Sequence, residues 1–216
     1  TFIAQEIAKY PNLLESLPTK ESGVRYRLEG FLFPATYSIK ESTTIESLID
    51  DMLAAMDKTL TPYYSTIKSK NLTVNDLLSI ASLVEKEGAK TEDRKLIAGV
   101  FYNRLNQGIP LQSNIAILYA QGKLGEKISL ADDVAIDTSI KSPYNVYTNL
   151  GLMPGPVDSP SQDAIESSIN QTKSQNLYFV ANVTDGKVYY AVTQQEHDRN
   201  VAEHVNSKLT QNSGSN

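Results

Sequence analysis

The chain has no cysteine among its 216 residues, which excludes disulfides, cysteine-ligated zinc and thiol catalysis. No apolar run approaches the ~20 residues that a membrane helix needs. No run rich in lysine or arginine is present and the formal net charge is -5, so we expect no nucleic-acid partner. The sequence also lacks a Gly-rich phosphate loop and a Gly-x-Ser-x-Gly elbow, which argues against a nucleotide-binding protein and a serine hydrolase. Its two histidines are seven residues apart, a spacing that does not indicate a metal site.

The residues that are present are those of an ordinary globular protein, with 40% hydrophobic and 21% charged side chains. Apolar residues at helical spacing predict several helices, and Asp185-Gly186 between two β-prone runs predicts a hairpin. Residues 28–37 and 128–170 are rich in turn-forming residues and predict long ordered loops. The fold class is therefore α+β, mainly helical with a late β-hairpin. We expect helices over 1–20 (broken at Pro11), 44–69, 73–84, 91–108, 161–170 and 194–209, and strands over 177–183 and 187–192.

Two carboxylates, Glu85 and Glu87, end an apolar helical run and precede Gly88. A carboxyl group beside apolar surface has a raised pKa, so it can stay protonated near neutral pH and give a proton to a leaving oxygen. Each helical residue turns about 100°, which places the two glutamates on opposite flanks of the apolar stripe. They therefore do not suit the close carboxylate pair of a retaining glycosidase. Periodicity leaves open which glutamate is the acid, and a solvated helix end is the alternative interpretation.

The loop over 144–156 contains tyrosines and asparagines and ends with Pro154, Gly155 and Pro156. Exposed tyrosine rings can bind the apolar face of a sugar, and amides can bind its hydroxyl and acetamido groups. The alternative is a loop that caps the core and is stiffened by its prolines.

Six segments occur in the order in which they occur in a known family: 29–34, 81–87, 100–105, 111–112, 144–147 and 151–156. Over about residues 28–204 the chain resembles the YceG/MltG-like endolytic murein transglycosylases of bacterial cell walls. It departs from the family pattern at some positions, since Asn114 and Ile115 stand where an aspartate and a proline are usual.

The resemblance implies that Glu87 is the catalytic acid and that Glu85 supports it. It also implies three regions. Residues 1–27 would be a helical segment leading in from a missing upstream module, 28–209 a lysozyme-like catalytic domain, and 210–216 a disordered tail. In this family a membrane helix and a LysM-like module precede the catalytic domain. We therefore expect a single-pass anchor upstream and a location at the extracytoplasmic face of the bacterial cell membrane.

The implied reaction cleaves the β-1,4 bond between N-acetylmuramic acid and N-acetylglucosamine inside a glycan strand, leaves 1,6-anhydro ends and terminates nascent chains. No metal or cofactor is implied, and penicillin-binding proteins and other wall-synthesis proteins are the expected partners. A non-catalytic peptidoglycan-binding module is one alternative. The other is a muramidase-type hydrolase with Asp132, Asp133 or Asp137 as its base. The expected substrate-binding residues are Glu85, Asn103, Gln112, Asn114, Tyr144, Asn145 and Tyr147.

Overall fold

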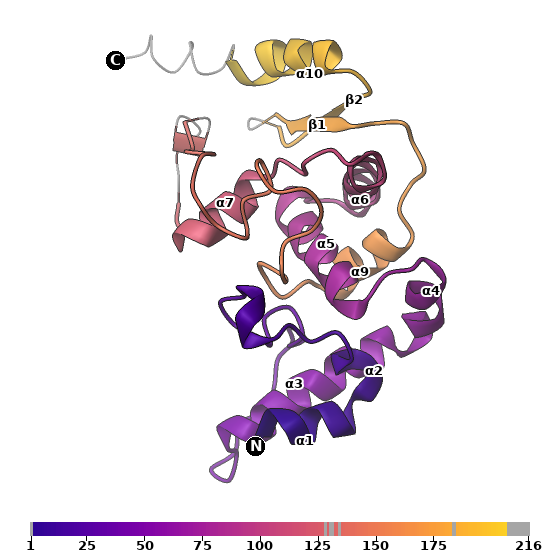
Figure 1. Ribbon diagram of the computed structural model, residues 1–216, viewed down its shortest axis with the longest axis vertical. Coiled ribbons are helices and arrows are strands. Elements are labelled where there is room, and N and C mark those ends of the chain that lie inside the picture. Colours follow the sequence, from indigo (N-terminus) through magenta and orange to yellow (C-terminus); the bar gives the residue numbers. More distant parts are fainter. Residues whose placement is uncertain (1, 128, 130–131, 134, 183–184, 207–216) are drawn as a thin grey trace. The chain divides into compact units, whose positions relative to one another are not determined.

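The structure is a computed structural model that describes residues 2–127, 129, 132–133, 135–182 and 185–206 (Figure 1). Residue contacts divide the chain into two compact units. One unit extends up to Lys86 and includes Leu152–Asn170; the other contains Glu87–Gly151 and the described residues from Gln171 onward. The predicted architecture, mainly helical with a late hairpin, is confirmed. The predicted tail over 210–216 lies outside the described residues.

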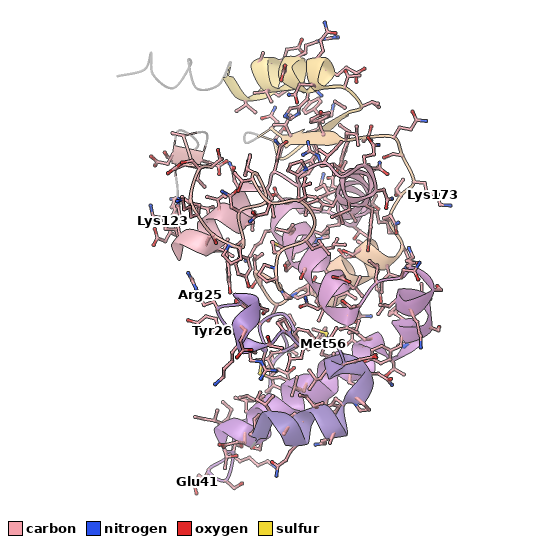
Figure 2. The ribbon with its side chains drawn as sticks, in the orientation of Figure 1. Arg25, Tyr26, Glu41, Met56, Lys123 and Lys173 are labelled. Carbon is pink, nitrogen blue, oxygen red and sulfur yellow. The ribbon has the colours of Figure 1, made fainter. Side chains whose placement is uncertain are left out.

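Helices build the first unit around one apolar core. Figure 2 shows Met56 among these helices, where its side chain is fully buried, whereas Tyr26 and Glu41 are exposed. The predicted break at Pro11 is confirmed, because a helix ends before it and a short helix starts with it. The helices are α1 (Phe2–Lys9), α2 (Pro11–Leu14), α3 (Ile45–Leu60), α4 (Tyr64–Ser69), α5 (Val74–Glu87, whose last residue belongs to the second unit) and α9 (Gln162–Ile169), with 3-10 turns at Lys20–Ser22 and Thr61–Tyr63.

The single helix predicted over 44–69 is wrong. α3 ends at Leu60, a 3-10 turn follows, and α4 begins at Tyr64. The cause is Pro62, which has no N–H for the helical ladder and whose ring crowds the preceding turn. The start of α3 is fixed by a capping box, in which Thr44 Oγ1 accepts from Ser47 N and Ser47 Oγ accepts from Thr44 N.

Helix α5 carries both candidate carboxylates, and its start is the one that the sequence predicts. Thr73 N donates to Asp76 Oδ2 at 2.9 Å and Asp76 N donates to Thr73 Oγ1 at 3.0 Å, a reciprocal cap. The helix is buried on more than its apolar stripe, since Ser82 is also inaccessible and its Oγ accepts from Val157 N at 3.1 Å. This packing fixes the direction of the helix and therefore of its C-terminal end.

Two of the segments that carry the resemblance contact each other in the first unit, namely 29–34 and the part of 151–156 from residue 152 onward. Gly30 has φ +80°, and a Cβ on it would lie 2.3 Å from two ring carbons of Pro156. Only glycine permits both the left-handed backbone and this close approach. These two segments therefore have a packing role in the fold.

The second unit combines helices with the hairpin (Figure 1). The strands pair antiparallel from Tyr178 opposite Ala191 to Ala181 opposite Val188, and Phe179 packs edge-on against Phe101 at 5.9 Å between ring centroids. The sequence analysis did not predict helix α7 (Asn114–Gln121), although Ser113 precedes it and Gly122 follows it in left-handed backbone, two residue types that are typical of helix ends. The elements are α6 (Thr91–Gln107), α7 (Asn114–Gln121), β1 (Tyr178–Ala181), β2 (Val188–Ala191), α10 (Gln194–Val201) and a π-helical turn at Ala202–Asn206.

The predicted start of α6 at Thr91 and its end before Gly108, which has φ +64°, are confirmed. The closing helix predicted over 194–209 is regular α-helix only to Val201, and residues 207–209 lie outside the described part. Among the described residues, no helix is both long and apolar enough to cross a membrane.

Candidate active site

Glu87 is the last residue of α5 and is half-buried. Ser113, which is buried, donates a hydrogen bond from Oγ to Glu87 Oε1 at 2.7 Å. The next residue, Gly88, allows a close approach, because a Cβ there would lie 2.7 Å from Arg94 Cγ. Arg94 Nε also donates to the Gly88 carbonyl at 2.9 Å. The end of α5 is therefore held in one conformation by contacts within the second unit.

The surroundings of Glu87 favour its neutral form. Burial raises its pKa to about 7, the hydrogen bond from Ser113 opposes this rise, and the charge of Asp133 adds to it. Burial disfavours the charged carboxylate, and a nearby like charge acts in the same direction. A carboxyl group with this pKa can both donate and accept a proton near neutral pH.

Asn114 links two other polar groups of the second unit. Its Nδ2 donates to the Asp133 carbonyl at 3.1 Å and to Asp133 Oδ1 at 3.2 Å. Its Oδ1 accepts from the Tyr147 hydroxyl at 2.6 Å. The structure therefore brings together two of the predicted substrate-binding residues, Asn114 and Tyr147, and adds a carboxylate beside them.

Tyr147 is half-buried and its phenol stays neutral. Burial raises its pKa to about 12, the charges of Glu87 and Asp133 add to the rise, and the charge of Arg104 opposes it. The neutral hydroxyl is therefore a hydrogen-bond donor at every physiological pH.

Gln112 is exposed and adopts a positive φ of +56°. Its side-chain Oε1 accepts from Arg104 Nη1 at 2.8 Å, and its backbone N donates to the Val146 carbonyl at 3.0 Å. Arg104 is 5% exposed and also donates to the carbonyls of Pro110 and Leu177, at 2.6 and 2.5 Å. This arginine therefore fixes the turn that leads into Ser113 and Asn114.

Tyr144 and Asn145 are buried, 4% and 0% exposed, so the exposed surface expected of them is absent. Tyr144 packs on the ring of Tyr119, 4.7 Å between centroids. Asn145 Nδ2 donates to the carbonyls of Thr138 and Ile140, at 3.0 and 2.7 Å, and its Oδ1 accepts from Tyr147 N at 2.9 Å. Tyr144 and Asn145 therefore fit the alternative interpretation, in which the loop caps the core. Their contacts hold the segment that carries Tyr147.

Glu85 and Asn103 hold backbone segments. Glu85 Oε2 accepts from Ser161 N at 3.0 Å and from Ser161 Oγ at 2.5 Å, at the N-terminus of α9, where a negative charge is favoured. Asn103 Nδ2 donates to the carbonyls of Ser174 and Asn176, both at 2.9 Å, so both amide hydrogens are used inside the protein. The two glutamates of α5 contact different segments, as their spacing predicts.

Sequence reasoning missed Ser113 and Arg104 as site residues, and Asp133 entered only as one of three candidate bases. A hydroxyl next to Gln112 gives no signal that it reaches a glutamate in another helix. Ile97, Val100 and Phe101 lie seven, four and three residues before Arg104 and so share its face of α6, which could have indicated that the arginine is buried.

A hollow of about 580 Å³ lies beside the loop that carries Tyr147. It is lined by Ser139, Ile140, Lys141, Ser142, Pro143, Thr148 and Asn149. Glu87 is not among these residues, so we do not assign the hollow to the chemistry. No group of three or more histidine, aspartate or glutamate side chains suited to a metal ion occurs among the described residues.

The helices, the late hairpin and a half-buried glutamate at a helix end define the class of domain to which this chain is compared. Residues 2–203 match the model of the YceG-like family, and the chain belongs to that family. It is 85% identical over 97% of its length to the endolytic murein transglycosylase of Streptococcus pneumoniae strain D39, and 36% identical over 96% to that of Bacillus subtilis. It spans 38% and 56% of these two relatives.

A solved structure shares the fold. The crystal structure of a putative YceG-like protein from Listeria monocytogenes aligns with a TM-score of 0.79 at 36% identity, over 92% of this chain and 63% of that one. The arrangement of helices and hairpin is therefore that of the family.

Proposed function

We propose that this chain is the catalytic part of an endolytic murein transglycosylase. The proposed reaction cleaves the β-1,4 bond between N-acetylmuramic acid and N-acetylglucosamine within a glycan strand and leaves a 1,6-anhydro end. The relatives that carry this name support the proposal. The observation that carries it is the Glu87 carboxyl, held by Ser113 at the end of α5 with its pKa raised to about 7.

Glu87 would act first as an acid. Its proton passes to the glycosidic oxygen while the bond from that oxygen to C1 of the muramic acid breaks, and N-acetylglucosamine leaves with a free 4-hydroxyl. The resulting Glu87 carboxylate then takes the proton from the muramyl 6-hydroxyl as that oxygen bonds to C1. One carboxyl group serves both steps and ends the cycle protonated, so the reaction consumes no water. A pKa near the working pH suits both transfers.

Ser113 and Tyr147 would assist without exchanging protons. The Ser113 hydroxyl occupies Glu87 Oε1, which leaves Oε2 to face the sugar and fixes the plane of the carboxyl group. Tyr147 and Asn114 are hydrogen-bonded to each other, so they form a pre-arranged polar edge for the substrate. Holding the sugar so that its own hydroxyl attacks supplies the larger part of the rate.

The test is Glu87→Gln, assayed by release of anhydro-muropeptides from purified sacculi. We expect loss of at least about 100-fold, the lower end of general acid–base contributions. The matched control is Glu92→Gln, the same change at an exposed position in the first turn of α6, which should release product at the wild-type rate. Wild-type release by the Glu87 variant would refute the proposal.

The alternatives predict different outcomes. A non-catalytic wall-binding module would bind glycan strands without turnover and would be indifferent to Glu87→Gln. A hydrolase would yield reducing muramic acid ends, heavier by one water than the anhydro product. The nearby Asp133 gives the hydrolase a carboxylate that could activate water, so the mass of the product decides between the two enzymes.

We further propose that in the full-length protein this domain works at the extracytoplasmic face of the cell membrane, beside penicillin-binding proteins and other wall-synthesis proteins. The family resemblance and the partial coverage of the relatives support this proposal. Fractionation of cells expressing the full-length protein should place it with the membrane, and cross-linking should recover a penicillin-binding protein. Recovery of the protein from the cytosol alone would refute this placement.

A further inference from the structure

Asp133 is tied to the candidate site by one amide group. Asn114 Nδ2 contacts both its carbonyl oxygen, at 3.1 Å, and its Oδ1, at 3.2 Å. The other end of the same amide accepts from the Tyr147 hydroxyl at 2.6 Å. Asn114 begins helix α7 and directly follows Ser113, whose hydroxyl donates to Glu87 Oε1 at 2.7 Å. Two consecutive residues therefore hold the acid and the half-buried carboxylate of Asp133.

The charge of Asp133 acts on the groups around it. It raises the pKa of Glu87, after burial and against the hydrogen bond from Ser113, and it also raises the pKa of Tyr147. Two carboxylates in one site repel each other, so one of them keeps its proton to higher pH.

Other charged side chains near the end of α5 are engaged elsewhere. Lys86 forms an ion pair with Asp158 at 2.7 Å, and Arg94 donates to the Gly88 carbonyl. Glu85 accepts from Ser161. Arg104 lowers the pKa of Tyr147 but is not among the influences on Glu87.

We propose that Asp133 is a positioning residue of this site, whose fixed negative charge opposes a second negative charge on Glu87 and so holds the acid's proton until a glycosidic oxygen takes it. That this retained proton serves catalysis rests on the proposed function. That the charge of Asp133 acts on Glu87 does not. In this proposal the side-chain amide of Asn114 holds the carboxylate of Asp133 in place.

The test compares three single substitutions. Asp133→Asn removes the charge while its side-chain oxygen can still accept from Asn114. Asp133→Glu keeps the charge and should restore the wild-type behaviour. Asp132→Asn makes the same charge change at the neighbouring residue, which is exposed and accepts a hydrogen bond from Ser129. Circular dichroism checks that each variant folds. If Asp133→Asn does not fold, Asp133→Ser takes its place.

Two measurements are made on each variant of the 216-residue chain. The first is the pH titration of the Glu87 side-chain carboxyl by ¹³C NMR, assigned by its absence in Glu87→Gln. The second is the alkaline limb of the pH–rate profile on sacculi. In Asp133→Asn both should move to lower pH by about half a unit, the scale of a screened like-charge interaction, so that activity at pH 8 falls by roughly threefold.

An Asp133→Asn titration that coincides with that of Asp132→Asn would overturn the proposal. So would a shift that Asp133→Glu fails to reverse. The NMR titration needs no turnover, so it also separates the two proposals. If Glu87 shows the shift but sacculi are not cleaved, the proposed function fails and the electrostatic role of Asp133 stands.

Discussion

Replacing Glu87 by glutamine should make the chain more resistant to unfolding at pH 8, with little effect at pH 4. The folded-state pKa of Glu87 is about 7, above its ordinary value of 4.5. The carboxyl group therefore favours the folded state below pH 4.5, and this contribution is lost as the pH rises from about 4.5 to 7. Glutamine does not ionise, and its side-chain oxygen can still accept from Ser113.

The size of the effect follows from the same two values. At 1.36 kcal/mol for each pH unit, the interval from 4.5 to about 7 corresponds to ~3 kcal/mol. Because Glu87 keeps some contact with solvent, screening reduces the expected gain to about 1–3 kcal/mol in the free energy of unfolding. In a chain of this size that is a rise in Tm of a few °C, since about 1 kcal/mol moves Tm by roughly 2–4 °C.

The assay is thermal unfolding at pH 4, 6 and 8, with Glu92→Gln as the matched control. The stability gained by Glu87→Gln over wild type should grow from pH 4 to pH 8, whereas the control, which loses a favourable charge in the first turn of α6, should gain no stability over this range. A difference that is constant with pH, or a glutamine variant that is less stable at pH 8, would refute the reasoning about burial.

Three further changes test the supporting contacts. Ser113→Ala should raise the pKa of Glu87 above about 7, because it removes a hydrogen bond that favours the charged carboxylate. The alkaline limb of the pH–rate profile should therefore move to higher pH, while the plateau rate falls because Ser113 no longer fixes the carboxyl group. Arg104→Ala should lower the free energy of unfolding by about 3 kcal/mol, because it leaves the part-buried carbonyls of Pro110 and Leu177 without their donor and empties a buried side-chain site. Urea denaturation measures this loss. Gly99→Ala should cost about 1–3 kcal/mol in the same assay, because its Cβ would lie 2.6 Å from the Thr172 carbonyl oxygen.

Local signals predicted the framework of the fold. The reciprocal cap at Thr73, the left-handed Gly108 and the turn at Asp185-Gly186 each act through neighbouring residues, so the sequence alone was sufficient for two long helices and the hairpin. Pro62 could also have predicted the break between α3 and α4. The apolar residues at helical spacing on either side of it led instead to the prediction of one continuous helix. The lysozyme-like description of the core stays a prediction.

The site could be predicted only in part, because its properties come from contacts between distant segments. The helix-end position of Glu87 is local, but its pKa depends on burial first and then on Ser113 and Asp133, which lie in other parts of the chain. Asn103 and Arg104 are adjacent in α6, and only packing shows that the arginine holds the turn leading into Ser113. Burial of Tyr144 likewise has no signal in its residue type.

In the proposed reaction, the Glu87 carboxyl closes the muramyl 6-hydroxyl onto C1 without using water. The most direct measurement is the mass of the muramic acid ends released from sacculi by the wild-type chain in H₂¹⁸O. We expect 1,6-anhydro ends that are free of ¹⁸O and that disappear with Glu87→Gln. Ends that contain ¹⁸O, or anhydro ends that persist in the Glu87 variant, would contradict it.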